Sequence, residues 1–86
     1  MRVEWPEWWE WELDLTGHVE TRMEDRGFSE VELRAMLERA RSMAPDVMEG
    51  RWRVATTFEG AVWIVIVEPD PEAAKLVVIT AFPVTR

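Results

Sequence analysis

A strict alternation of apolar and acidic residues is the clearest pattern in the first part of the chain. From Trp9 to Leu15 every second residue is apolar, and the residues between are acidic. A period of two is typical of a half-buried β-strand. Pro6 delays the start of such a strand unless the strand lies at a sheet edge. We therefore expect a strand over residues 9–15, within a tryptophan-rich extension that spans residues 1–15.

The next segment changes to a helical period. Thr16 is a suitable N-cap for a helix over about residues 17–25, and Gly27 is well placed to end it. Ser29, followed three residues later by a glutamate, forms a capping box at the start of a second helix. The apolar stripe expected on this helix comprises Val31, Leu33, Met36, Leu37, Ala40 and Met43. The two helices together are predicted to occupy residues 16–43.

The last part of the chain returns to a period of two. Residues 52–58 alternate, a Glu-Gly pair indicates a tight hairpin, and residues 61–68 are apolar on both faces, as in a central strand. With a final strand over residues 76–82, these segments predict an antiparallel meander over residues 51–83. The expected fold is a single α+β domain over residues 1–86, with an N-terminal strand and two helices packed on a three- to four-stranded antiparallel sheet.

Composition narrows the class of protein. The chain has 86 residues and 48% hydrophobic content, which favours one folded domain over disorder. The absence of cysteine excludes disulfides and thiolate metal sites, and it is compatible with a reducing cytoplasm. The longest apolar run, residues 61–67, is too short to span a bilayer, and no basic region precedes an apolar run at the N-terminus. We expect a cytoplasmic protein that does not enter a membrane.

The net charge of the chain limits the kinds of partner that it can bind. The net charge is −7, from 17 acidic and 10 basic residues. Because affinity for a phosphate backbone comes largely from cationic contacts, this excess disfavours a broad nucleic-acid-binding surface. A local basic pocket is still allowed, since salt screens exposed charges beyond about 8 Å. The acidic residues near the N-terminus indicate a docking partner, which could be basic.

The residues most suggestive of chemistry are His18, Arg22 and Arg26, which follow one another at intervals of four. A four-residue step advances about 400° around a helix, so their side chains form one stripe. Imidazole exchanges a proton near neutral pH, and guanidinium binds phosphate oxygens through a planar fork. This pattern suits chemistry on a phosphate. An exposed helix whose arginines pair with acidic neighbours would look the same.

Two stretches resemble a known bacterial family, the domain of unknown function 4258. They are His-Val-Glu-x-Arg-Met-x-x-Arg-Gly-Phe-Ser-Glu-x-Glu at residues 18–32 and Val-Val-Ile-Thr-Ala-Phe-Pro at residues 77–83. The resemblance covers most of residues 16–83 and leaves the tryptophan-rich extension outside. That family is grouped with RelE-like and barnase-like ribonuclease toxins, in which two helices precede an antiparallel sheet.

The resemblance implies a metal-independent RNA endonuclease of the toxin type, with no cofactor and with an antitoxin as partner. The implied catalytic residues are His18, Arg22, Arg53 and Thr80, and the implied substrate-binding residues are Arg26 and Phe82. His18 would be the acid/base residue, Arg22 would hold the scissile phosphate, and Thr80 would supply a hydroxyl. Phe82 departs from the family pattern, which often has a tyrosine there. The second acid/base group is therefore unassigned.

A non-catalytic interaction domain is the alternative. In this interpretation the tryptophan-rich strand and its acidic residues mediate dimerisation or bind another protein, since tryptophan is enriched both in cores and at interfaces. In ordinary structural roles, His18 would bond a nearby backbone group, and Arg53 would pair with Glu59 or Glu68. With one histidine and no cysteine, the sequence has no zinc signature and we assign no metal.

Overall fold

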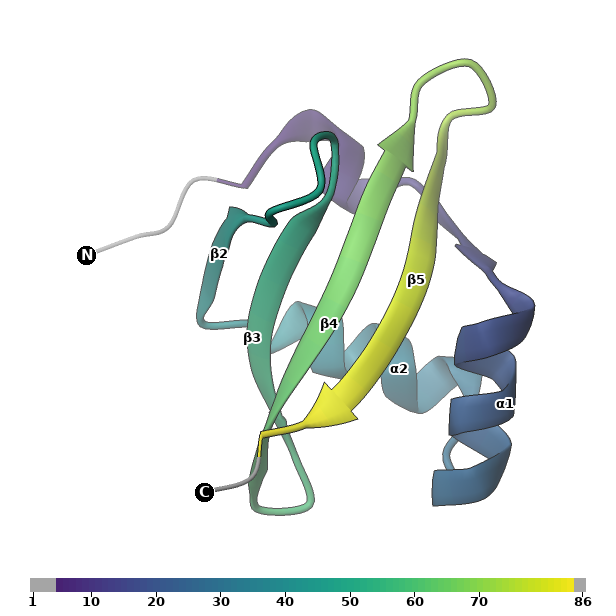
Figure 1. Cartoon of the computed structure of the whole chain (residues 1–86), viewed down its shortest axis with the longest axis vertical. Helices are drawn as coiled ribbons and strands as arrows, with labels where there is room; N and C mark the ends of the chain where they lie inside the picture. The colour runs from purple at the N-terminus through teal and green to yellow at the C-terminus, as the bar shows by residue number, and fades with distance from the viewer. Residues whose placement is uncertain (1–4, 85–86) are drawn as a thin grey trace.

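Five strands form one mixed sheet in the computed structural model, which describes residues 5–84. In chain order the elements are η1 (Glu7–Glu10), β1 (Glu12–Leu15), α1 (Gly17–Arg26), α2 (Glu30–Glu38), β2 (Ser42–Pro45), β3 (Trp52–Phe58), β4 (Ala61–Asp70) and β5 (Lys75–Pro83) (Figure 1). The strand order is β1-β5-β4-β3-β2, with β1 parallel to β5 and all other pairs antiparallel. The predicted α+β class with two helices is confirmed.

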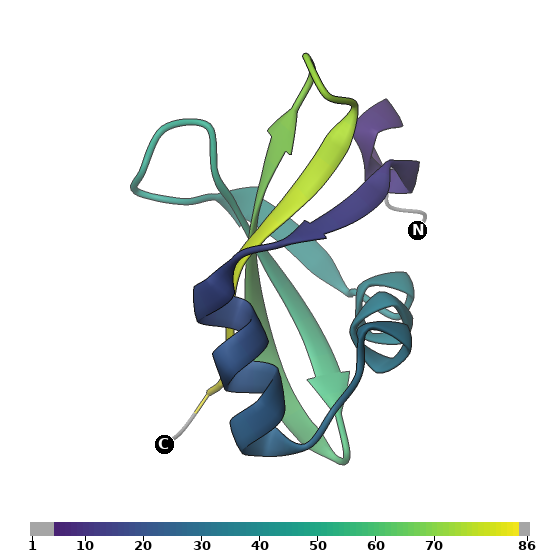
Figure 2. The same cartoon turned by 90° about the vertical axis from the view of Figure 1, so that its right-hand side faces the viewer.

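The helix α2 and the 3-10 helix η1 lie on the same face of the sheet, and α1 lies beside β5 (Figures 1 and 2). The core forms on this face. Val54, Val65 and Val78 are fully buried there, together with Leu33 and Leu37 of α2. The opposite face, here called the open face, has no helix over it in the described part of the chain. Its central residues are Arg53, Ala55, Ile64, Ile66, Thr80 and Phe82.

The tryptophan-rich segment differs from the prediction, because its strand begins at residue 12 and not at residue 9. The backbone N–H of Trp9 donates to the carbonyl of Pro6 at 3.0 Å, which closes a 3-10 turn. Trp9 is only 8% exposed and stacks on Trp5 with ring centroids 4.4 Å apart. Trp8 packs against Trp52 of β3. Residues 5–11 are thus packed on the core, whereas residues 1–4 of the predicted extension lie outside the described residues.

The second helix also ends earlier than predicted, at Glu38 instead of residue 43. Met43 belongs to β2, where it pairs with Val54 of β3. An exposed sheet edge offers a row of unpaired backbone groups, and residues 42–45 satisfy those of β3. Val31, expected on the apolar stripe, is 79% exposed. With β2 at one edge and β1 parallel to β5 at the other, the sheet is mixed and has five strands, whereas an antiparallel sheet of three to four strands was predicted.

A β-bulge in β5 decides which face Thr80 occupies. Val78 pairs with Val67 of β4, but Thr80 pairs with the adjacent Ile66, so Ile79 is an extra residue on β5. Before the bulge Val78 is buried in the core, whereas after it Ala81 is buried instead. Uninterrupted alternation would have placed Thr80 on the core face with Val78. The bulge turns Thr80 to the open face.

The start of α1 is attached to β5 by one side chain. The Thr16 hydroxyl lies 3.1 and 3.0 Å from the carbonyls of Val78 and Ile79, and its oxygen accepts from the Val19 backbone N–H at 3.2 Å. We expect Thr16→Ala to lower the free energy of unfolding by about 1–2 kcal/mol, because it removes an N-cap and a bond to β5. Urea denaturation measures this loss. Thr16→Ser keeps the hydroxyl, and an equal loss in that variant would contradict the explanation.

Candidate functional site

The charged residues of α1 divide between two flanks of the helix. Val19 and Met23 are buried and mark the side that faces the core. One residue corresponds to about 100° around a helix. His18, Arg22 and Arg26 precede the positions of this stripe by one residue and therefore lie to one side of it. Glu20 and Glu24 follow those positions by one residue and lie to the other side. The predicted His/Arg stripe therefore exists as the cationic flank of α1.

The far end of the cationic flank reaches the sheet. The guanidinium carbon of Arg26 lies 5.8 Å from the centre of the Trp63 ring, in cation–π range. Arg26 and Trp63 line one hollow with Glu59 and Pro83, which belong to the β3–β4 turn and the end of β5. Arg26 is thus placed by an aromatic contact. Arg22, one turn earlier, is half-buried, and His18 is exposed.

Arg53 and Thr80 lie in one row across the open face. Both residues pair with Ile66, Arg53 from β3 and Thr80 from β5. Their α-carbons are therefore separated by two strand spacings, or about 10 Å. A phosphate group fits within the reach of an arginine side chain over this distance. Phe82 occupies the next outward position on β5, where it pairs with Ile64 and is half-buried.

The Thr16 contact places the first turn of α1 beside this row. The Thr16 hydroxyl bonds the carbonyls of Val78 and Ile79. On β5, Thr80 directly follows Ile79. On α1, His18 lies two residues after Thr16. The structure brings the start of the cationic flank and the hydroxyl of β5 to adjacent segments. Within residues 5–84, His18 and Arg22 form no side-chain hydrogen bond or ion pair with the protein. The bond from His18 to a nearby backbone group, which is expected if this histidine has only a structural role, is absent from residues 5–84.

Arg53 has a partner that the sequence did not indicate. Its guanidinium donates to the carboxylate of Asp46 at 3.3 Å, whereas Glu68 pairs with Arg51. Burial opposes ionisation of Asp46, but backbone N–H groups and Arg53 outweigh it and lower the pKa of this carboxyl below its ordinary value. Asp46 is therefore ionised at neutral pH and compensates part of the Arg53 charge. It lies on the β2–β3 loop, which projects on the side of the sheet opposite α2 (Figure 2).

Candidates for the second acid/base group are few near His18. The Thr21 hydroxyl donates to the Gly17 carbonyl at 3.0 Å, so its proton is already engaged. Asp25 is exposed but lies two helical turns further along α1. Within residues 5–84 there is no group of three or more metal-ligating side chains. The arrangement offers one imidazole and two guanidiniums on α1, one guanidinium on β3 and one hydroxyl on β5.

Comparison with known proteins assigns the chain to a family. Residues 15–83 match the model of the domain of unknown function DUF4258, which covers well over half of the chain. The protein belongs to the DUF4258 family, as the motifs predicted. No curated protein and no solved structure matches the chain. Among residues 5–84, every helix is too short or too polar to cross a membrane.

Proposed function

We propose that this protein is a metal-independent ribonuclease with a RelE-like or barnase-like arrangement of its site. The proposal rests on one observation above all: Arg53 and Thr80 share a row on the open face, next to the point where Thr16 holds the cationic flank of α1. The proposal is supported by the positions of Arg53 and Thr80 on the open face and of His18 and Arg22 on α1. Ile66 lies between Arg53 and Thr80 in this row and is itself buried, so the two polar side chains form the surface there.

In the proposed reaction, His18 takes the proton of a ribose 2′-hydroxyl, whose oxygen attacks the adjacent phosphorus. The bond from phosphorus to the 5′-oxygen breaks, and a cyclic phosphate forms. Arg22 and the free edge of the Arg53 guanidinium stabilise the negative charge that builds on the phosphate, which is often the largest contribution to such catalysis. The leaving oxygen takes its proton from solvent. Without a positioned general acid, we expect slow turnover.

Arg22→Ala is the substitution that tests the role of the cationic flank. We expect it to slow RNA cleavage by about tenfold or more, because a hydrogen bond from a charged group contributes about 1.5–3 kcal/mol. A fluorescently labelled RNA, incubated with purified protein in excess EDTA, measures the rate. Arg41→Ala removes an equal charge from an exposed loop and serves as the control. Wild-type protein that leaves the RNA intact would overturn the proposal.

The second candidate is a non-catalytic interaction domain. The observation that favours it is the position of β1, which is an edge strand of the sheet and carries exposed Glu12 and Asp14. Edge strands are templates for pairing with another chain. The tryptophans provide less surface for this function than the sequence suggested, since Trp9 is buried and its neighbours are packed against the core. A cognate antitoxin could equally use this edge.

A further inference from the structure

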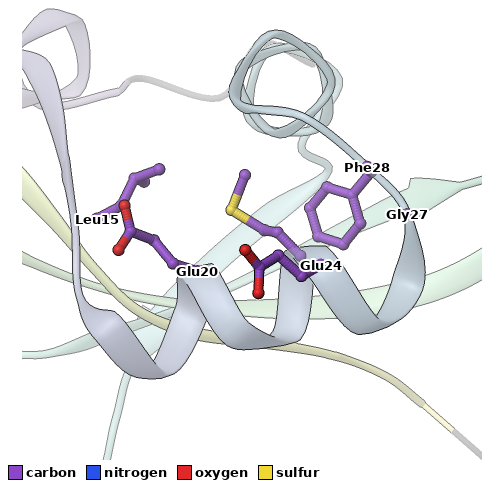
Figure 3. Close-up of a pocket in the computed structure, with 6 residues that line it drawn as sticks. Leu15, Glu20, Glu24, Gly27 and Phe28 are labelled. Carbon is purple, nitrogen blue, oxygen red and sulfur yellow. The ribbon is translucent and has the colours of Figure 1, made fainter.

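A groove opens along α1, between the end of β1 and Phe28, on the flank of α1 that faces away from the proposed ribonuclease site. Its volume is about 410 Å³, and it is lined by Leu15, Glu20, Met23, Glu24, Gly27 and Phe28. Figure 3 shows both glutamates directed from α1 into this space, with Leu15 at one end and Phe28 at the other. The groove thus combines an apolar floor with a wall of two carboxylates.

The apolar floor is the exposed remainder of core side chains. Met23 and Phe28 are 7% and 6% exposed, so each contributes only its outer edge to the groove. Leu15, the last residue of β1, is half-buried. A volume of this size accommodates one or two apolar side chains, at the small end of the range for ligand sites. The floor is rigid because its residues belong to the packed core.

Among residues 5–84, neither carboxylate has a counter-ion. The ion pairs within residues 5–84 use Glu12, Asp46 and Glu68, and neither Glu20 nor Glu24 takes part in one. The two glutamates are four residues apart, so they lie one above the other along the groove wall. Two like charges at this spacing repel each other slightly, and a cationic ligand between them would relieve that repulsion.

We propose that this groove binds a cationic amphipathic segment of a partner protein. An apolar side chain of the segment fills the space between Leu15, Met23 and Phe28, and arginine or lysine residues about one helical turn apart meet Glu20 and Glu24. The charge of the wall excludes a phosphate backbone, which would be repelled. The occupant therefore matches the basic partner that the net charge of −7 favours. This site does not depend on the proposed ribonuclease activity.

A designed peptide tests the groove. The probe is a fluorescein-labelled 14-residue helical peptide with leucines at one face and arginines flanking them, and the comparison peptide carries glutamate in place of each arginine. We expect the arginine peptide to bind and the glutamate peptide to fail, as measured by fluorescence anisotropy. The double variant Glu20→Gln/Glu24→Gln should weaken binding about two- to thirtyfold, because it removes two exposed ion pairs that contribute about 0.2–1 kcal/mol each.

A matched variant separates the groove from general electrostatic attraction. Asp25→Asn/Glu49→Gln removes the same charge from exposed positions outside the groove. Binding of the arginine peptide should be nearly unchanged in this variant, and equal weakening in both double variants would overturn the proposal. Failure of the wild-type protein to bind the arginine peptide would also overturn it. If light scattering without peptide gave a different mass for the Glu20→Gln/Glu24→Gln variant than for the wild type, the groove would bind a second copy of this chain instead.

Discussion

Replacing His18 by alanine is expected to slow RNA cleavage by about 10²–10⁴-fold, the usual contribution of a general acid or base. It is the only histidine in the chain, so no other imidazole can take over the proton transfer. The rate of cleavage of a labelled RNA in EDTA measures the effect. His18→Gln keeps a polar side chain of similar reach but cannot exchange a proton near neutral pH, and it should be equally slow.

The same substitution should leave the fold intact. His18 is exposed and lies outside the apolar stripe of α1, so its loss creates no cavity. Urea denaturation should give unfolding free energies for the variant and the wild type that agree within about 0.5 kcal/mol, as is usual for surface positions. Cleavage at the wild-type rate by folded His18→Ala protein would exclude His18 as the catalytic base, and the proposed reaction would be wrong.

Trp9→Ala is expected to destabilise the protein by about 3–5 kcal/mol, the typical cost of removing a buried aromatic side chain. Trp9 is 8% exposed, stacks on Trp5 and packs within the main core. For a domain of this size, such a loss is a large part of the total stability. Chemical denaturation followed by circular dichroism measures it, since fluorescence would change with the number of tryptophans.

Trp11 provides the matched control, because it is also a tryptophan of this segment but is only half-buried. Trp11→Ala should cost clearly less than Trp9→Ala. Light scattering on both variants addresses the interaction alternative. If Trp9→Ala left stability unchanged and reduced an oligomer to a monomer, the segment would be an interface and its assignment to the core of one chain would be wrong.

Local patterns predicted the starts of both helices and the central strands well. Thr16 and Ser29 cap α1 and α2 as expected, and the capping box with Glu32 is present. The hairpin between β3 and β4 turns at Glu59 and Gly60, both with positive φ. These features depend on hydrogen bonds and side-chain periods that close within a few residues, so a single sequence contains them.

The edges of the sheet could not be predicted in the same way. Met43 fits a helical stripe and a short strand equally well, and only the availability of the β3 edge decides for the strand. The alternation at Trp9 likewise suits a strand, but Pro6 accepts the bond that forms a turn. In both places the local pattern fits two different structures. Packing against residues far along the chain selects one of them.

In the candidate site too, some features follow from the local sequence and others only from the tertiary structure. The spacing of His18, Arg22 and Arg26 was enough to place them on one flank of a helix, because that flank is set by the helical period alone. The position of Thr80 on the open face depends on the bulge at Ile79, and the compensation of Arg53 depends on Asp46 in a loop. A bulge shifts the register between two strands, and a loop contact joins separate elements. The periodicity of a single strand indicates neither the register shift nor the loop contact. Only the folded chain therefore decides which of these groups face the same surface.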